Sequence, residues 1–218
     1  MKKLFFYSLI FITSISLSAC LNVNREIKFD ASGKGNEKLT VVLGSEFMSM
    51  MAALSKMDDS GKTDPYDDNK FIGDITTALK EVPGITINNV SSVIGQDSSN
   101  TLKIDYNFDN IPALASALLG KESQGDSIIS YYTLGDSVYF SYIVNMNSGN
   151  AEDSSSSMND AYKELFINDK LIVKFEFPYT VTSSNGTSIS GRKVTWDMPM
   201  NDVMGKDKVI LRAVMKKD

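Results

Sequence analysis

Alternating apolar and polar residues predict a series of short paired strands. Residues 23–29 and 39–43 alternate on both sides of a Gly-containing turn, which is typical of a hairpin. Two further hairpins are predicted around the turns at 97–100 and at Gly135-Asp136, and Asn185-Gly186 predicts another tight hairpin turn. The predicted strands cover residues 23–29, 39–43, 85–94, 101–108, 128–133, 138–146, 171–177, 193–196 and 208–215.

Apolar residues at helical spacing lie between these strands. The first helix is predicted to start at Ser45, the second to end before Pro83-Gly84, and the third to start at Asp109 or Asn110. A short fourth helix is expected after Ser157. Antiparallel β hairpins interspersed with three or four short helices packed on the sheet predict an α+β fold.

The first twenty residues combine a positive start, a short apolar run and small residues before a cysteine. Two lysines precede the apolar run at 4–15, and Leu17-Ser18-Ala19-Cys20 closely matches a bacterial lipobox. The run is shorter than the ~20 residues of a membrane-spanning helix. We expect residues 1–19 to be cleaved and Cys20 to be lipid-modified. The alternative is a secreted protein cut near Ala19, whose unpaired Cys would lack an explanation.

Cys20 is the one cysteine of the chain, so the mature protein has no internal disulfide. Residues 20–218 are expected to form a single extracytoplasmic domain tethered by Cys20, with a core large enough to be stable alone. The signal holds two lysines and no acid, which leaves 20 basic and 27 acidic side chains and a formal charge of −7. This acidic balance argues against nucleic acid as a partner.

The absence of His removes most catalytic and metal-binding arrangements. Ser-His-Asp and Cys-His triads, His general bases and His-based zinc sites are excluded. Paired carboxylates can act alone in glycosidases, but the acids here fall on outward strand positions or in loops. The acidic stretch 58–70 lacks EF-hand spacing and is interpreted as a solvated loop rather than a calcium site. We expect no enzyme activity, no metal and no cofactor.

The predicted first helix and one strand are the candidates for an apolar binding site. Met is frequent on adaptable binding surfaces, although a Met stripe also packs well on a sheet. Residues 138–146 are apolar on both faces, so this strand is expected either to be covered on both sides or to line a cavity. Trp196 is expected to be a buried anchor. The candidate ligand-binding residues are Phe47, Met50, Met51 and Leu54.

Both ends of the mature chain contain short motifs. The C-terminal motifs are Phe177-Pro178-Tyr179-Thr180-Val181, Ser184-Asn185-Gly186 and Gly191-Arg192-Lys193-Val194-Thr195-Trp196. The N-terminal end has the lipobox, a short strand, the turn Asp30-Ala31-Ser32-Gly33-Lys34-Gly35 and a Val-rich strand. Together these segments resemble the LppM-like bacterial lipoproteins. The resemblance implies an extracytoplasmic α+β domain for which lipid or glycolipid binding has been proposed, and it supplies no catalytic residues. Family members usually have a transmembrane helix after the domain. None follows here, so the lipid on Cys20 is the expected sole anchor.

Two functions agree with these patterns. The first is a membrane-anchored lipoprotein whose non-catalytic domain binds a lipid or other apolar ligand at the cell envelope. The alternative is a structural or assembly lipoprotein that acts through contacts with other envelope proteins. Leu21, not Asp, follows Cys20. In a cell with two membranes we therefore expect the outer membrane, facing the periplasm.

Overall fold

The computed structural model describes residues 21–57, 68–119, 128–145, 166, 168–204 and 206–217, and it confirms the α+β fold. Alternating segments form strands and the three amphipathic segments form helices, as their periodicity predicts. In chain order the elements are β1 (Leu21–Phe29), β2 (Gly35–Leu43), α2 (Ser45–Met57), α3 (Asp68–Lys80), β3 (Ile85–Ile94), β4 (Asn100–Phe108), α4 (Ile111–Leu119), β5 (Ile129–Leu134), β6 (Ser137–Asn145), β7 (Lys170–Glu176), β8 (Thr180–Ser184), β9 (Ser188–Ser190), β10 (Lys193–Pro199), α6 (Met200–Met204) and β11 (Lys208–Lys216).

The strands form two sheets. The larger has seven strands in the order β3-β4-β2-β1-β7-β10-β9, and the smaller has four in the order β5-β6-β11-β8. The three predicted hairpins β1–β2, β3–β4 and β5–β6 are present and antiparallel. The central pair β1 and β7 is parallel, which the hairpin pattern did not indicate. Alternation shows which face of a strand is buried, but it does not show which distant strand lies beside it.

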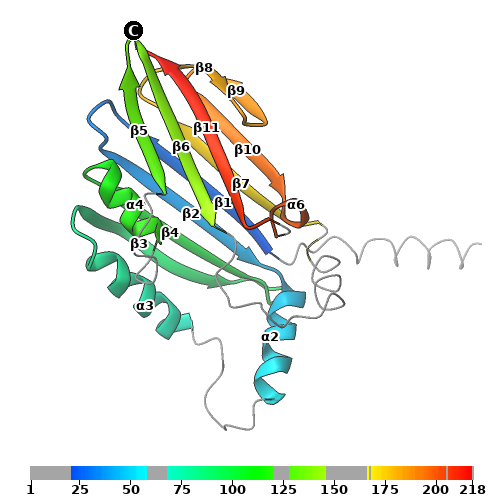
Figure 1. Cartoon of the computed structure of the whole chain (residues 1–218). Helices are drawn as coiled ribbons and strands as arrows, with labels where there is room; N and C mark the ends of the chain where they lie inside the picture. Colours follow the sequence, from blue (N-terminus) through cyan, green and yellow to red (C-terminus); the bar gives the residue numbers. More distant parts are fainter. Residues whose placement is uncertain are drawn as a thin grey trace, which may run out of the picture.

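One face of the seven-stranded sheet is covered and forms the core. The four-stranded sheet lies over β1, β7 and β10, while α3 and α4 pack beside it over β3 and β4 (Figure 1). Phe140 of the smaller sheet contacts Phe175 and Phe177 of the larger, with ring centroids 4.7 and 5.0 Å apart. The opposite face of the larger sheet carries charged cross-strand pairs, so it is the solvent face.

The segment around Asn185-Gly186 corrects one prediction. It does not connect a hairpin, because β8 pairs with β11 of the smaller sheet whereas β9 pairs with β10 of the larger. The two residues therefore lie where the chain passes from one sheet to the other. Gly186 has no positive φ angle, which a type I′ hairpin turn would require. The β9–β10 hairpin turns instead at Gly191, whose φ is 60°.

Strand β6 has one buried face and one surface face. Val138, Phe140 and Tyr142 are buried in the core, as predicted. The other face is half-exposed, and there Tyr139 stacks on Tyr132 with centroids 5.3 Å apart. The expectation that β6 is covered on both sides is therefore wrong, because its second apolar face lies at the surface. Trp196 is 2% exposed, which confirms its role as a core anchor.

Several predicted features lie outside the described residues: the signal at 1–19, Cys20, the acidic stretch from 58 to 67 and most of the expected fourth helix. Phe166, at the end of that helix, is buried in a turn. In the described part of the chain, no helix is long and apolar enough to cross a membrane. The same residues contain no group of acidic, His or Cys side chains that could hold a metal ion.

Candidate functional site

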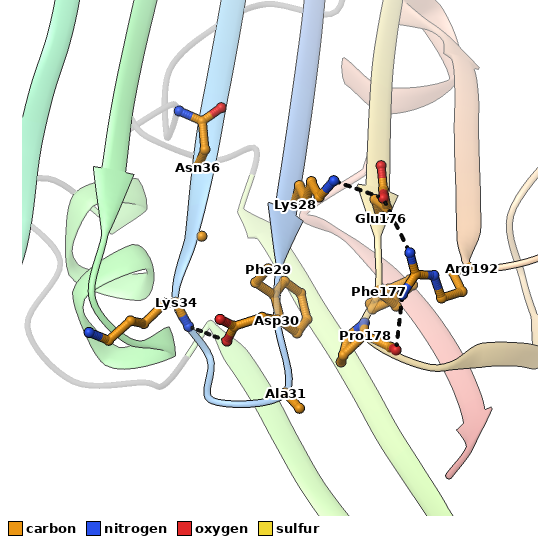
Figure 2. A pocket seen from close by; sticks show the side chains of 11 residues that line it. Lys28, Phe29, Asp30, Ala31, Lys34, Asn36, Glu176, Phe177, Pro178 and Arg192 are labelled. Carbon is orange, nitrogen blue, oxygen red and sulfur yellow. Dashed lines mark hydrogen bonds and ion pairs between the residues drawn. The ribbon is translucent and has the colours of Figure 1, made fainter. Parts of the chain in front are cut away.

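An open groove of about 450 Å³ lies at the end of the sandwich opposite Leu21. Three segments form it: the end of β1 with the following turn, the end of β7, and the turn before β10 (Figure 2). Their side chains converge because β1, β7 and β10 are neighbours in the sheet, and β1 and β7 end at the level where β10 begins. The lining residues are Lys28, Phe29, Asp30, Ala31, Lys34, Gly35, Asn36, Glu176, Phe177, Pro178 and Arg192.

The floor of the groove is apolar. Phe29 and Phe177 contact each other edge to face, with centroids 5.6 Å apart, and both are also part of the core. Gly35 lets the strands approach closely here, because a Cβ at this position would collide with the Lys28 carbonyl oxygen and the Phe108 ring. The floor is therefore held rigidly by the core beneath it.

The rim of the groove is built around Glu176. Its carboxylate pairs with Lys28 at 3.1 Å, Lys193 at 3.4 Å and Arg192 at 3.8 Å. Lys28 and Lys193 lie directly opposite Glu176 on the two neighbouring strands, so the register fixes this arrangement. The hydrogen bond from Lys28 lowers the pKa of Glu176, and Lys193 adds to this effect. One carboxylate therefore faces three cations, which leaves positive charge at the rim.

The turn after β1 completes the other side of the groove. The Asp30 carboxylate accepts hydrogen bonds from Ser32 N at 2.8 Å, Ser32 Oγ at 2.6 Å and Lys34 N at 3.2 Å. The bond from the Ser32 hydroxyl lowers the Asp30 pKa, with smaller contributions from backbone amides. Asp30 is therefore occupied in shaping the turn, whereas the Lys34 side chain points away from the Glu176 cluster (Figure 2).

A second polar cluster lies between the sheets. Arg25 on β1 pairs with the buried Glu37 on β2, with 2.9 Å between Nε and Oε1. Arg25 also donates a 2.7 Å hydrogen bond to Tyr142 of the smaller sheet, and Tyr106 donates to the second Glu37 oxygen. Every member has a partner, so the cluster ties the sheets together rather than offering free groups to a ligand.

The environment changes the pKa of three of these residues. Burial raises the pKa of Tyr106 well above its usual range, and the Glu37 carboxylate adds to this effect. Burial is also the main cause that raises the pKa of Tyr142. Burial opposes the charged form of Arg25, but the Glu37 carboxylate together with Tyr142 and Tyr106 outweighs it, and the pKa rises above the ordinary value. The cation and both neutral phenols are thus stable forms of the folded protein.

The candidate residues predicted from the sequence lie elsewhere. Phe47 is half-buried and packs against the core, and Met50 is half-buried. Met51 and Leu54 belong to α2, but their side chains are outside the description, as is Cys20. Neither Phe47 nor Met50 lines the groove, because α2 follows Leu43 at the opposite end of the sheet. Whether they bind a ligand stays a prediction.

The groove was missed because its residues are ordinary turn and strand-end residues in the sequence. The sequence marks Phe177-Pro178 and residues 30–35 as turns of the chain. No sequence pattern indicates that these two segments lie next to each other. Their proximity depends on the parallel pairing of β1 with β7, which joins strands far apart in the chain.

Comparison with known proteins does not show a family for this chain. No family model and no curated protein matches the chain. Among solved structures, the folded domain of LppM from Mycobacterium tuberculosis is a neighbour with 16% sequence identity and a TM-score of 0.45. The match covers 92% of this chain and 91% of that one. Membership of the LppM-like family therefore stays a prediction.

Proposed function

We propose that the protein is a lipid-anchored lipoprotein of the bacterial envelope whose non-catalytic domain binds an amphiphilic anion in the groove. The observation behind the proposal is the combination of an aromatic floor with a cationic rim in an acidic chain. The ligand class is a lipid or other apolar molecule with a negatively charged group.

The anchor is inferred from the lipobox and its distance from the fold. Leu21 is the first residue of β1 and pairs with Leu43, so the domain starts directly after Cys20. An extended residue spans about 3.3 Å, which would hold the domain close to the membrane. Two or three acyl chains on Cys20 would be a stable anchor. In a cell with two membranes we place the protein on the outer membrane, facing the periplasm.

The ligand class follows from the groove. Three lining residues are cationic and two are acidic, and Lys193 adds a further cation at Glu176. An anionic group can take the place of the Glu176 carboxylate beside Lys28 and Arg192, where hydrogen bonds to charged groups are strong. Apolar atoms of the same ligand would lie on Pro178 and on the small accessible parts of Phe29 and Phe177, which are 3% and 1% exposed. A groove of this size is within the usual range for small ligands, about 300–1,000 Å³.

Calorimetric titration tests the groove with two short-chain probes. We expect dihexanoyl phosphatidylglycerol, which is anionic, to bind more tightly than dihexanoyl phosphatidylcholine, which is zwitterionic. In the K28Q/R192Q variant the dissociation constant for the anionic probe should rise about tenfold or more, because charged hydrogen bonds are lost. The control is Lys170→Gln, which removes a cation at the opposite end of the sheet. Equal affinity of K28Q/R192Q and the unchanged protein would exclude the groove.

The anchor has its own test. Intact mass spectrometry of protein isolated from membranes should show diacylglycerol and a further acyl chain on a chain that starts at Cys20. Cys20→Ala should remove this mass and release the domain from the membrane fraction. A full-length chain with a free Cys20 thiol would contradict the proposal.

A second candidate function is assembly through protein contacts. Tyr132 and Leu134 on the edge strand β5 are 56% and 69% exposed, and an edge strand can pair with another chain. A photo-reactive residue at position 134 should then give an adduct of one defined mass in intact cells. The adduct should disappear when Tyr132 is changed to Ser.

A further inference from the structure

The strands of the larger sheet end in one row beside the expected anchor. Leu21 lies opposite Leu43, Leu43 lies opposite Asn100, and Asn100 lies opposite Ile94. Neighbouring strands are about 4.8 Å apart, so Ile94 lies roughly 14 Å from Leu21 along this row. The row, which we call the base of the domain, is at the opposite end of β1 from the groove.

The outer corner of the base is apolar and exposed. Val93 and Ile94 end the edge strand β3, and they are 57% and 65% exposed. Successive residues of a strand point to opposite faces, so this corner presents apolar side chains on both faces of the sheet. The corner therefore offers two exposed apolar side chains next to each other in the chain.

Helix α2 begins at the same base. It follows Leu43 after one residue, and Figure 1 shows it at the end of the sheet where β1 begins. Phe47 fixes the helix to the core, while Ala52 and Ala53 are exposed. The base therefore has apolar surface at the β3 corner and on a helix next to β1.

We propose that this base rests on the lipid bilayer, with Val93 and Ile94 inserted at the level of the headgroups. This rests on the proposed anchor, because a lipid on Cys20 would hold Leu21 within one or two residues of the membrane, and the rest of the row would then lie along the membrane surface. A bilayer surface can contact both faces of a corner at once, which suits two neighbouring residues that point to opposite faces of the sheet. Asp97 lies in the turn beyond Ile94. Its carboxylate is compatible with a position near the headgroups, because it accepts hydrogen bonds from Ser99 N and Oγ at 3.1 and 2.6 Å.

The proposal also orients the groove. Strand β1 has nine residues, so its far end lies about 27–30 Å from Leu21. The groove then opens away from the membrane that holds the anchor. Its ligand reaches it from the aqueous phase or from a carrier, not by sliding out of the same leaflet.

Tryptophan probes test the orientation in the full chain tethered to vesicles through Cys20. The vesicles contain phosphatidylethanolamine and phosphatidylglycerol at 3:1, with or without phospholipids brominated near the headgroup. If isolated protein has a free Cys20 thiol, a maleimide phospholipid supplies the tether. The probes are Ile94→Trp at the base and Leu134→Trp as a matched exposed position on the smaller sheet. Trp196 is buried and gives a constant background.

We expect brominated lipid to quench at least half of the added fluorescence of Ile94→Trp and none of that of Leu134→Trp. Equal quenching of the two probes, or none at position 94, would overturn the proposal. A failure of the proposed anchor can be distinguished from a failure of the proposed membrane contact. The mass of the isolated protein shows whether Cys20 carries a lipid, whereas the maleimide tether tests the contact of the base with the membrane without that lipid. Unchanged near-UV circular dichroism of both variants would show that the fold is intact.

Discussion

The indole nitrogen of Trp196 donates a 2.9 Å hydrogen bond to the side-chain oxygen of Asn185, which lies between the two sheets. The same oxygen accepts the backbone N–H of Arg212 at 2.8 Å, and Asn185 Nδ2 donates to the Ile210 carbonyl at 2.8 Å. Trp196 belongs to the larger sheet, and residues 210 and 212 belong to β11 of the smaller sheet. One amide side chain therefore joins the sheets where the chain passes between them.

Replacing Asn185 by Ala should destabilise the fold by about 1–3 kcal/mol, because the buried Trp196 N–H loses its acceptor. A double-mutant cycle with Trp196→Phe isolates this bond. In a protein that carries Trp196→Phe, Asn185→Ala should lower the free energy of unfolding by about 1 kcal/mol less than it does in the unchanged protein. Urea unfolding measures both losses. Strictly additive losses would show that the Trp196–Asn185 bond contributes nothing.

We expect a larger loss of stability when the Arg25–Glu37 ion pair is broken than when Asn185 is replaced. Glu37→Gln keeps the size of the side chain, but it replaces one of the two acceptor oxygens by an NH2 donor and leaves the half-buried Arg25 cation without its counter-charge. Breaking a buried ion pair on one side typically costs about 3–5 kcal/mol. Urea unfolding at neutral pH measures the loss.

The matched control removes both charges. In R25M/E37L the core has no unpaired ion, so this double variant should be more stable than Glu37→Gln, as buried pairs replaced by apolar residues often are. A double variant that is less stable than the single one would show that the cluster is needed for more than charge balance.

The hydrophobic pattern predicted most of the strands and the helices α2, α3 and α4, but it did not predict α6 or the arrangement of the elements. The inward positions on β4 are all buried: Leu102, Ile104, Tyr106 and Phe108. Apolar and polar residues alternate along this strand because one of its faces is exposed to solvent. The parallel pairing of β1 with β7 has no local signal, since it depends on which distant strands bury each other best. Asn185-Gly186 has the residues of a hairpin turn, yet tertiary contacts of Asn185 determine its conformation.

The candidate site was less predictable for the same reason. Arg25 and Glu37 stand at inward positions of alternating strands and form a pair, so the expectation that the acids fall on outward strand positions or in loops is wrong for Glu37. Their partner Tyr142 comes from the other sheet, so it could not be assigned. The groove needs the register of three strands, and no motif in the sequence encodes it.

Two glycines should respond in opposite ways to the same substitution. Gly35→Ala introduces a Cβ against the Lys28 carbonyl and the Phe108 ring, so we expect a loss of about 2 kcal/mol or more. A Cβ added at Gly73 in helix α3 would meet no atom within 4 Å, so Gly73→Ala should stabilise the protein by about 0.5–1 kcal/mol. Thermal unfolding of the two variants distinguishes them, and a neutral Gly35→Ala would contradict the close approach.

The solvent face of the larger sheet should make the protein sensitive to acid. Hydrogen bonds from Lys174 and Lys28 lower the pKa values of Glu26 and Glu176 below their ordinary value of 4.5. Their contribution to stability is therefore present above about pH 4.5 and is lost as the pH falls through the lower folded values. E26Q/E176Q should show a shallower loss of stability in this range. Salt at about 1 M should reduce the difference, because exposed ion pairs are screened.

Tyrosine ionisation predicts the behaviour at high pH. Burial raises the pKa of Tyr131 to about 12, and it raises those of Tyr106 and Tyr142 as well. An unfolded tyrosine ionises near pH 10, so the stability that these phenols provide is complete below about pH 10 and declines above it. Tyr131→Phe should reduce the steepness of this decline between about pH 10 and 12, measured by urea unfolding at several pH values. Residues 20–218 contain eight tyrosines, because Tyr7 lies in the signal that we expect to be cleaved, and absorbance at 295 nm should show fewer than eight of them ionising before the protein unfolds. Ionisation of all eight near pH 10 in the folded state would contradict the buried positions.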